Sequence, residues 1–161
     1  MIAAMALSVL LVVVTVLLFY EVLRLTTNHL ADLPLPPRAR IIPVVIACFV
    51  GHTAAVWIYA GGYWLLAYLE YGDVTGMTAE QYQDFLYFSV TTYTSLGFGD
   101  HLPLSHSRLL AGVQALNGLM LIGWSASFTY LAMERYWPMH EERRRGRQQV
   151  AELRPEEKDA A

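Results

Sequence analysis

The chain has 161 residues, of which 55% are hydrophobic and only 16% are charged, and its mean hydropathy is +0.35. Soluble domains typically carry about 25% charged residues, so the composition excludes a soluble enzyme with one large core and a nucleic-acid-binding protein. A secreted fold held by disulfides is excluded as well, because Cys48 is the sole cysteine of the sequence. The net charge of −3 says little about function, whereas the placement of the charges is informative.

Charged residues are absent from three long runs of the sequence, residues 1–20, 41–69 and 109–133. An apolar helix needs about 20 residues to cross the hydrocarbon core of a bilayer. Three crossings are therefore the simplest interpretation, and we expect an all-α membrane protein. The first run predicts a retained N-terminal transmembrane helix at 1–27, because it lacks the positive start and the small-residue cleavage site of a secretory signal.

Two polar segments complete the expected order of elements. The connector 28–40 contains three prolines, which break helices, so we expect a loop at a membrane face. The charged tail 138–161 has mixed signs and is expected to be frayed helix followed by disorder. Its basic cluster 143–147 most simply flanks the last span, with contact to anionic lipid as the alternative.

Lys and Arg are distributed unevenly along the chain. No basic residue lies between Arg40 and Arg108, whereas the connector and the tail are rich in arginine. The positive-inside bias therefore predicts a cytoplasmic connector and C-terminal tail, with the N-terminus and residues 70–107 outside. The absence of organelle signals favours the plasma (inner) membrane.

The segment between the second and third spans contains an apolar stretch that is too short to cross a membrane. Residues 85–99 are uncharged, and a stretch of this length is typical of a re-entrant piece. We expect a short helix at 78–94, because Thr78 and Gln81 have the spacing of a capping box. No strand is expected before the loop that follows.

That loop, residues 95–100, contains glycine at every second position. Gly97 and Gly99 end the helix and reach positive φ easily, so that successive carbonyl groups can point the same way. Irregular backbone at membrane depth is tolerated only where it is buried in protein or lines water. Carbonyls gathered from several subunits replace the hydration shell of a cation. The loop therefore indicates a site for ions.

Residues 91–100, with the sequence Thr-Thr-Tyr-Thr-Ser-Leu-Gly-Phe-Gly-Asp, resemble the potassium-channel signature T-T-x-T-T-V-G-Y-G-D. The neighbouring segments fit the same family, so the resemblance covers a pore module at 41–137. The segments that it implies are an outer helix at 41–69, a pore helix at 78–94, a selectivity filter at 95–100 and an inner helix at 107–137.

The resemblance implies that filter carbonyls bind K⁺, with Asp100 at the outer mouth. The filter residues that it identifies are Ser95, Leu96, Gly97, Phe98 and Gly99. The carbonyl oxygens of the first four residues and the hydroxyl of Ser95 would bind K⁺. Each chain supplies one such loop and a pore of this family needs four, so the resemblance implies a homotetramer in the lipid bilayer.

The filter departs from the family pattern at three positions. Ser95 replaces Thr, Leu96 replaces Val behind the filter, and Phe98 replaces Tyr. Phe88 stands where an aromatic cuff often has Trp, so neither Phe88 nor Phe98 supplies a hydrogen-bond donor. The alternate glycines that shape the backbone are retained. The three departures instead affect the rigidity of the filter, and hence its preference for K⁺ over Na⁺.

Two residues of the last span have alternative interpretations. Gly118 lies ten residues after Arg108, where similar channels have a hinge glycine, so it is a candidate gating hinge. Close helix packing is the alternative, which Gly112 and Gly123 would share. Asn117 either lines a cavity below the filter or bonds to a neighbouring helix, and the second interpretation is favoured.

Three histidines are candidates for pH sensitivity. His52 lies within a predicted span, where an ionisable group indicates function by default. A neutral imidazole bonded to another helix is the simpler interpretation. His101 and His106 lie near the predicted outer mouth and are expected to be solvated turn residues, with tuning by external pH as the alternative.

These observations favour a potassium-selective channel subunit that conducts K⁺ passively, with K⁺ as permeant ion and no cofactor. The alternatives are a weakly selective monovalent cation channel and a non-conducting membrane scaffold of the same fold. An enzyme is not expected, because the sequence shows no acid–base pair, nucleophile or metal-ligand spacing. The expected partners are lipid, K⁺ and further copies of the chain, and not nucleic acid.

Overall fold

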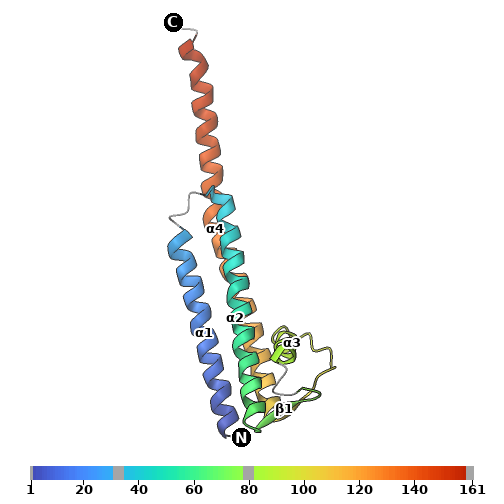
Figure 1. Ribbon diagram of the computed structural model, residues 1–161. Coiled ribbons are helices and arrows are strands. Elements are labelled where there is room, and N and C mark those ends of the chain that lie inside the picture. Colours follow the sequence, from blue (N-terminus) through green and yellow to red (C-terminus); the bar gives the residue numbers. More distant parts are fainter. Residues whose placement is uncertain (1, 31–34, 78–81, 159–161) are drawn as a thin grey trace.

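The computed structural model describes residues 2–30, 35–77 and 82–158. Three long helices stand side by side, and a short helix with a two-stranded sheet lies at one end of them (Figure 1). In chain order the elements are α1 (Ile2–Leu30), the 3₁₀ helix η1 (Pro37–Arg40), α2 (Ile41–Tyr68), β1 (Gly72–Val74), α3 (Tyr82–Tyr93), β2 (Pro103–Ser105) and α4 (Ser107–Lys158).

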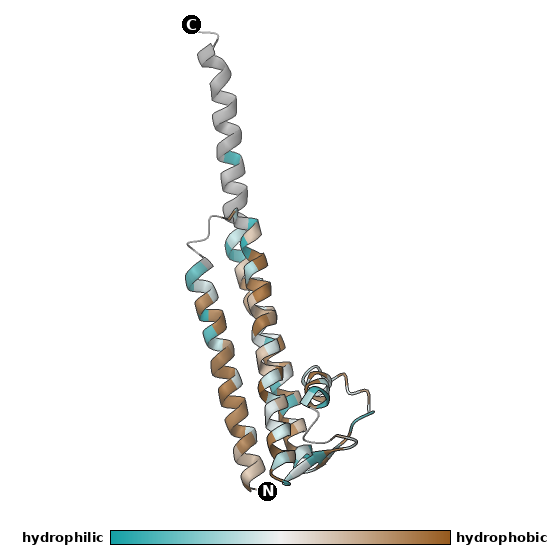
Figure 2. Cartoon of the chain, in the orientation of Figure 1, coloured by the Kyte–Doolittle hydropathy of each residue, from teal (hydrophilic) through white to brown (hydrophobic). Residues whose placement is uncertain are grey.

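Three of the helices are long and apolar enough to cross a membrane. The spans are Ile2–His29, Arg38–Tyr68 and Ser107–Tyr136. Brown, hydrophobic residues cover most of α1 in Figure 2, whereas α2 and the adjacent part of α4 mix brown with white. This arrangement confirms the prediction of an all-α membrane protein with three crossings, and the short helix α3 lies between the second and the third, as expected.

The helix α1 contacts both α2 and α4 along a single face. Its buried residues recur every three or four positions, which places them on one stripe of the helix. They are Ala4, Ser8, Leu11, Thr15, Phe19 and Leu23. The remaining apolar side chains of α1 are largely exposed, as expected for a helix that faces lipid on its other sides.

The two ends of the bundle carry different parts of the chain. The start of α1 lies at the same end as β1 and α3, whereas η1 and the C-terminal extension of α4 lie at the opposite end (Figure 1). At that opposite end Arg40 lies over the ring of Tyr136, 5.6 Å from its centroid, and Arg135 approaches the same ring at 5.9 Å. The arginine-rich segments are therefore together, as the predicted topology requires.

Several boundaries differ from the expected ones. The helix α1 continues to Leu30, and η1 replaces the last four residues of the expected loop, because proline is well suited to the first position of a helix. The capping box of Thr78 and Gln81 lies outside the described residues. The charged tail begins as helix, as expected, and α4 continues without interruption to Lys158.

The two-stranded sheet was not expected from the sequence. β1 and β2 pair antiparallel, with Gly72 opposite Ser105 and Val74 opposite Pro103. Beyond the strands, the amide of Thr75 donates to the carbonyl of Leu102 at 2.9 Å. Each strand has only three residues, too few to show an alternating pattern, and the pair joins the two ends of the segment that contains α3 and its loop.

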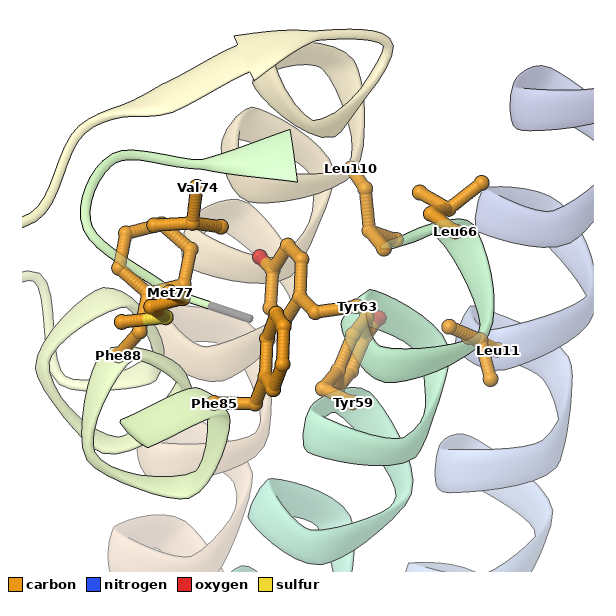
Figure 3. Close-up of a cluster of buried hydrophobic side chains, with 9 residues drawn as sticks. All are labelled: Leu11, Tyr59, Tyr63, Leu66, Val74, Met77, Phe85, Phe88 and Leu110. Carbon is orange, nitrogen blue, oxygen red and sulfur yellow. The ribbon is translucent and has the colours of Figure 1, made fainter. Parts of the chain in front are cut away.

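A cluster of nine buried side chains holds α3 against the long helices (Figure 3). The rings of Tyr63 and Phe88 meet edge to face, 4.9 Å apart. Behind them, Tyr63 donates to Oε1 of Gln114 at 2.6 Å, and Nε2 of Gln114 donates to the hydroxyl and the carbonyl of Ser89. Apolar packing and a satisfied polar network thus fix α3 between α2 and α4.

Candidate functional site

The loop after α3 begins with a hydrogen-bonded helix end. The amide of Ser95 donates to the carbonyl of Thr92 at 3.0 Å, and the amide of Leu96 donates to the carbonyl of Thr91 at 2.9 Å. This pair of bonds is the Schellman pattern, which requires a left-handed residue immediately after the helix. Gly97 adds a further bond to Thr91 at 3.2 Å. The first half of the loop is therefore anchored to α3.

Left-handed residues recur at every second position of this loop. The φ angles are +58° at Ser95, +49° at Gly97 and +81° at Gly99. The sequence predicted this conformation for the two glycines but not for Ser95, where the helix-ending pattern imposes it. In this loop, residues of positive φ therefore alternate with Leu96 and Phe98, which are not among the residues of positive φ.

The loop lies on the surface of the single chain. Every residue from 94 to 100 is exposed, and the loop extends away from the long helices (Figure 1). Leu96 is 58% exposed and Phe98 66%, so within one chain Leu96 does not pack behind the filter as expected. Phe88 is buried in the core cluster, and the two phenylalanines are not brought together. At membrane depth, irregular backbone of this kind is tolerated only where protein or water surrounds it.

Asp100 is tied to α3 by a contact that the sequence did not indicate. The hydroxyl of Tyr87 donates to Oδ2 of Asp100 at 2.8 Å, and Oδ1 accepts from the amide of His101. The Tyr87 hydroxyl holds the pKa of the Asp100 carboxyl below its usual range, and the same bond raises the pKa of Tyr87. Nothing in the sequence distinguishes Tyr87 from Tyr82 or Tyr93 on the same helix.

Replacing Tyr87 with phenylalanine is expected to raise the pKa of Asp100 toward its usual value. The lowered pKa belongs to the folded state, so the ionised carboxylate stabilises the loop above the ordinary pKa, and this contribution is lost as the pH falls through the folded value. In the variant, protonation begins at a higher pH. The pKa of Asp100 is measured by following the ¹³C chemical shift of its carboxyl group as a function of pH. Tyr82→Phe is the control, since the Tyr82 hydroxyl bonds to the carbonyl of Trp57 instead.

The two histidines near the loop hold the surrounding backbone together. Nδ1 of His101 lies 2.9 Å from the carbonyl oxygen of Thr75, and its ring meets that of Tyr87 edge to face. Nδ1 of His106 lies 2.6 Å from the carbonyl oxygen of Tyr71. Both residues are half-exposed and lie in a bend and a turn, as expected, and each imidazole also bonds to the backbone next to β1.

Gly118 lies where α4 passes the end of α3. A Cβ added at this position would collide with the carbonyl oxygen of Tyr93, the last residue of α3. Close packing therefore accounts for this glycine. A Cβ at Gly112 or Gly123 would meet nothing within 4 Å among the described residues, so the expected close approach is absent there.

His52 connects three helices behind the loop. Its Nδ1 lies 2.8 Å from the hydroxyl of Tyr93 on α3, and its Nε2 lies 3.0 Å from the hydroxyl of Ser125 on α4. Ser125 uses its own proton on the carbonyl of Ile122, so it accepts from His52. A neutral imidazole with its proton on Nε2 therefore satisfies every group, with Tyr93 donating to Nδ1.

Asn117 bonds to neighbouring helices, as the favoured interpretation predicted. Its Nδ2 donates to the hydroxyl of Thr15 on α1 at 2.8 Å and to the hydroxyl of Tyr59 on α2 at 3.1 Å. The side chain is buried, and no part of this arrangement requires a water-filled cavity. Asn117 and Gly118 thus place one turn of α4 against all three other helices.

Comparison with known proteins identifies the region built from these elements. A family model described as an ion channel matches residues 44–135, which is more than half of the chain. The match begins in α2, includes α3 and its loop, and ends within α4, so it leaves out α1. Searches of the curated proteins and of the solved structures gave no match. The chain belongs to the ion channel family.

Proposed function

We propose that this ion channel subunit forms a homotetrameric, potassium-selective pore that conducts K⁺ passively. The observation that carries the proposal is the recurrence of positive φ at Ser95, Gly97 and Gly99 in an exposed loop at the end of a short helix. Such a backbone presents carbonyl oxygens in succession, and a cation that has lost its water needs oxygen ligands of this kind.

The proposed ion sites are formed by main-chain oxygen atoms. Carbonyls of Ser95, Leu96, Gly97 and Phe98 would bind K⁺, with the Ser95 hydroxyl at the inner end, Gly99 completing the filter and Asp100 at the outer mouth. Main-chain oxygens are held in place by the bonds of the loop to Thr91 and by the tie between Asp100 and Tyr87. Conduction through such sites needs neither a cofactor nor a reaction.

Two exposed surfaces support the assembly of several copies. The loop itself is uncovered, although backbone of this kind is not tolerated against lipid. One face of α4 is also exposed and carries residues spaced three or four apart. These residues are Gly112, Leu116, Leu119, Met120, Gly123 and Ser127. Four copies arranged about one axis would cover both surfaces at once.

We also propose the topology that the distribution of arginine predicts. The N-terminus and the loop of the filter would lie outside, and the connector and C-terminal tail in the cytoplasm of a cell bounded by the plasma (inner) membrane. The start of α1 lies at the same end of the bundle as β1 and α3, and η1 lies at the opposite end, which supports this proposal (Figure 1).

Ion flux into liposomes that contain the purified protein tests the proposal. We expect K⁺ to permeate at least about tenfold better than Na⁺, which corresponds to a difference of about 1.4 kcal/mol. Empty liposomes with a K⁺ ionophore serve as the control for vesicle integrity. Equal permeation of both ions would favour a weakly selective cation channel, and a tetramer without flux at any pH or voltage would favour a non-conducting scaffold.

A further inference from the structure

The helix α1 lies outside the region matched by the family model, yet it fits closely into the subunit. A Cβ added at Gly51 of α2 would lie 2.8 Å from Cδ2 of Phe19, and one added at Gly62 would lie 2.6 Å from Cδ1 of Leu11. Small residues allow helices to approach each other closely in membranes. Two side chains of α1 therefore occupy glycine recesses on α2, three helical turns apart.

Between these two recesses, α1 forms a buried hydrogen bond with α4. The hydroxyl of Thr15 donates to the carbonyl of Leu11 at 2.7 Å and accepts from Nδ2 of Asn117 at 2.8 Å. Thr15 is fully buried and Asn117 is 6% exposed. Removing the hydroxyl would leave one amide proton of Asn117 without this acceptor, in a place that water does not reach.

The residues that Thr15 and Phe19 of α1 contact lie next to Tyr93, the last residue of α3. Asn117 immediately precedes Gly118, which lies against the carbonyl of Tyr93. The ring of Phe19 lies 4.8 Å from the ring of His52, and His52 in turn bonds to the hydroxyl of Tyr93. Tyr93 is thus held at its carbonyl by α4 and at its hydroxyl by α2, and α1 contacts both supports.

We propose that α1 is a positioning element of the filter. Through Thr15 and Phe19 it holds Asn117 and His52, and these hold the end of α3 from which the loop 95–100 starts. The helix does not touch the permeant ion. The consequence for selectivity rests on the proposed function, whereas the effect on the order of the loop is a property of the fold and can be measured separately.

Two substitutions at Thr15 distinguish the effect of its hydroxyl group from the effect of its side-chain volume. Thr15→Val removes the hydroxyl at nearly constant volume, and Thr15→Ser retains it. Thr26→Val is the matched control, because the Thr26 hydroxyl bonds to the carbonyl of Val22 within α1 itself. Phe19→Ala tests the second contact, with Tyr20→Ala as its control, since Tyr20 is 49% exposed on the same helix.

Hydrogen exchange of the amides in 94–99, followed by mass spectrometry on the assembled protein, is the first measurement. Interhelical hydrogen bonds in membranes are modest, so we expect Thr15→Val to speed exchange about threefold in this segment. Thr15→Ser, Thr26→Val and Tyr20→Ala should exchange as the wild type does, and Phe19→Ala should be faster. The second measurement is the ratio of K⁺ to Na⁺ flux in liposomes, which should fall in the same two variants.

Each outcome decides the proposal. Wild-type exchange in the loop of both Thr15→Val and Phe19→Ala would overturn it. So would an equal acceleration along the whole of α4, which would show general destabilisation instead of a local effect at the filter. If the wild type proves non-selective, the proposed function fails, while the exchange comparison still shows whether α1 orders the loop.

Discussion

Gly99→Ala is expected to abolish selective K⁺ flux while the protein still inserts into the membrane. The φ angle of Gly99 is +81°, and a Cβ there would meet nothing within 4 Å among the described residues, so the cost is conformational and not steric crowding by neighbours. A side chain in the left-handed region costs about 1–2 kcal/mol per residue. In a tetramer four such residues would face one axis, so the backbone would relax and its carbonyls would turn away.

Gly97→Ala is expected to act in the same direction but less severely. Its φ of +49° lies within the left-handed region that other residues visit occasionally, whereas +81° is further from it. Ion flux with K⁺ and Na⁺ gradients in liposomes measures the effect of both variants. Gly61→Ala is the matched control, because it lies within α2 and has open space around it, and alanine is the better helix former. Normal selectivity in Gly99→Ala would contradict the carbonyl filter.

The sequence was sufficient for features that depend on local composition. Three runs without charge predicted the three spans, because length and hydropathy decide whether a helix can cross a bilayer. The alternation of Gly97 and Gly99 predicted the positive φ angles, because no other residue adopts them as easily. The predicted spans and the irregular loop therefore needed no knowledge of which segments are in contact.

Other features depended on contacts between distant segments and were not predicted. The bond from Tyr87 to Asp100 joins residues that the loop brings together, and the pairing of β1 with β2 joins segments about 30 residues apart. For Gly118 the sequence left hinge and packing equally open, because the neighbour of a glycine on another helix has no local signature. The sequence predicted helix at the start of the tail but not its continuation to Lys158, although Glu, Arg and Gln favour helix.

Gly118→Ala is expected to have the second largest effect, because the added Cβ would collide with a backbone atom. The carbonyl of Tyr93 belongs to the last turn of α3 and cannot rotate away as a side chain would. Either α4 or the end of α3 must shift, and overpacking of this kind costs about 1–3 kcal/mol. We expect a lower stability, faster exchange in the loop 95–100 and a loss of K⁺ selectivity.

Gly61→Ala in α2, already the control for the loop variants, is the matched control here, because Gly61 lies outside the face of α4 that the proposed tetramer would cover. A Cβ there meets nothing within 4 Å among the described residues, so this variant should retain the stability and selectivity of the wild type. If Gly118 serves as a gating hinge, Gly118→Ala should keep the wild-type exchange of the loop and its K⁺ preference, and change only how often the pore opens. A displaced α3 instead alters the proposed filter, because Tyr93 and Ser95 are two residues apart. The exchange rate of the loop in Gly118→Ala therefore distinguishes the two roles before any current is recorded.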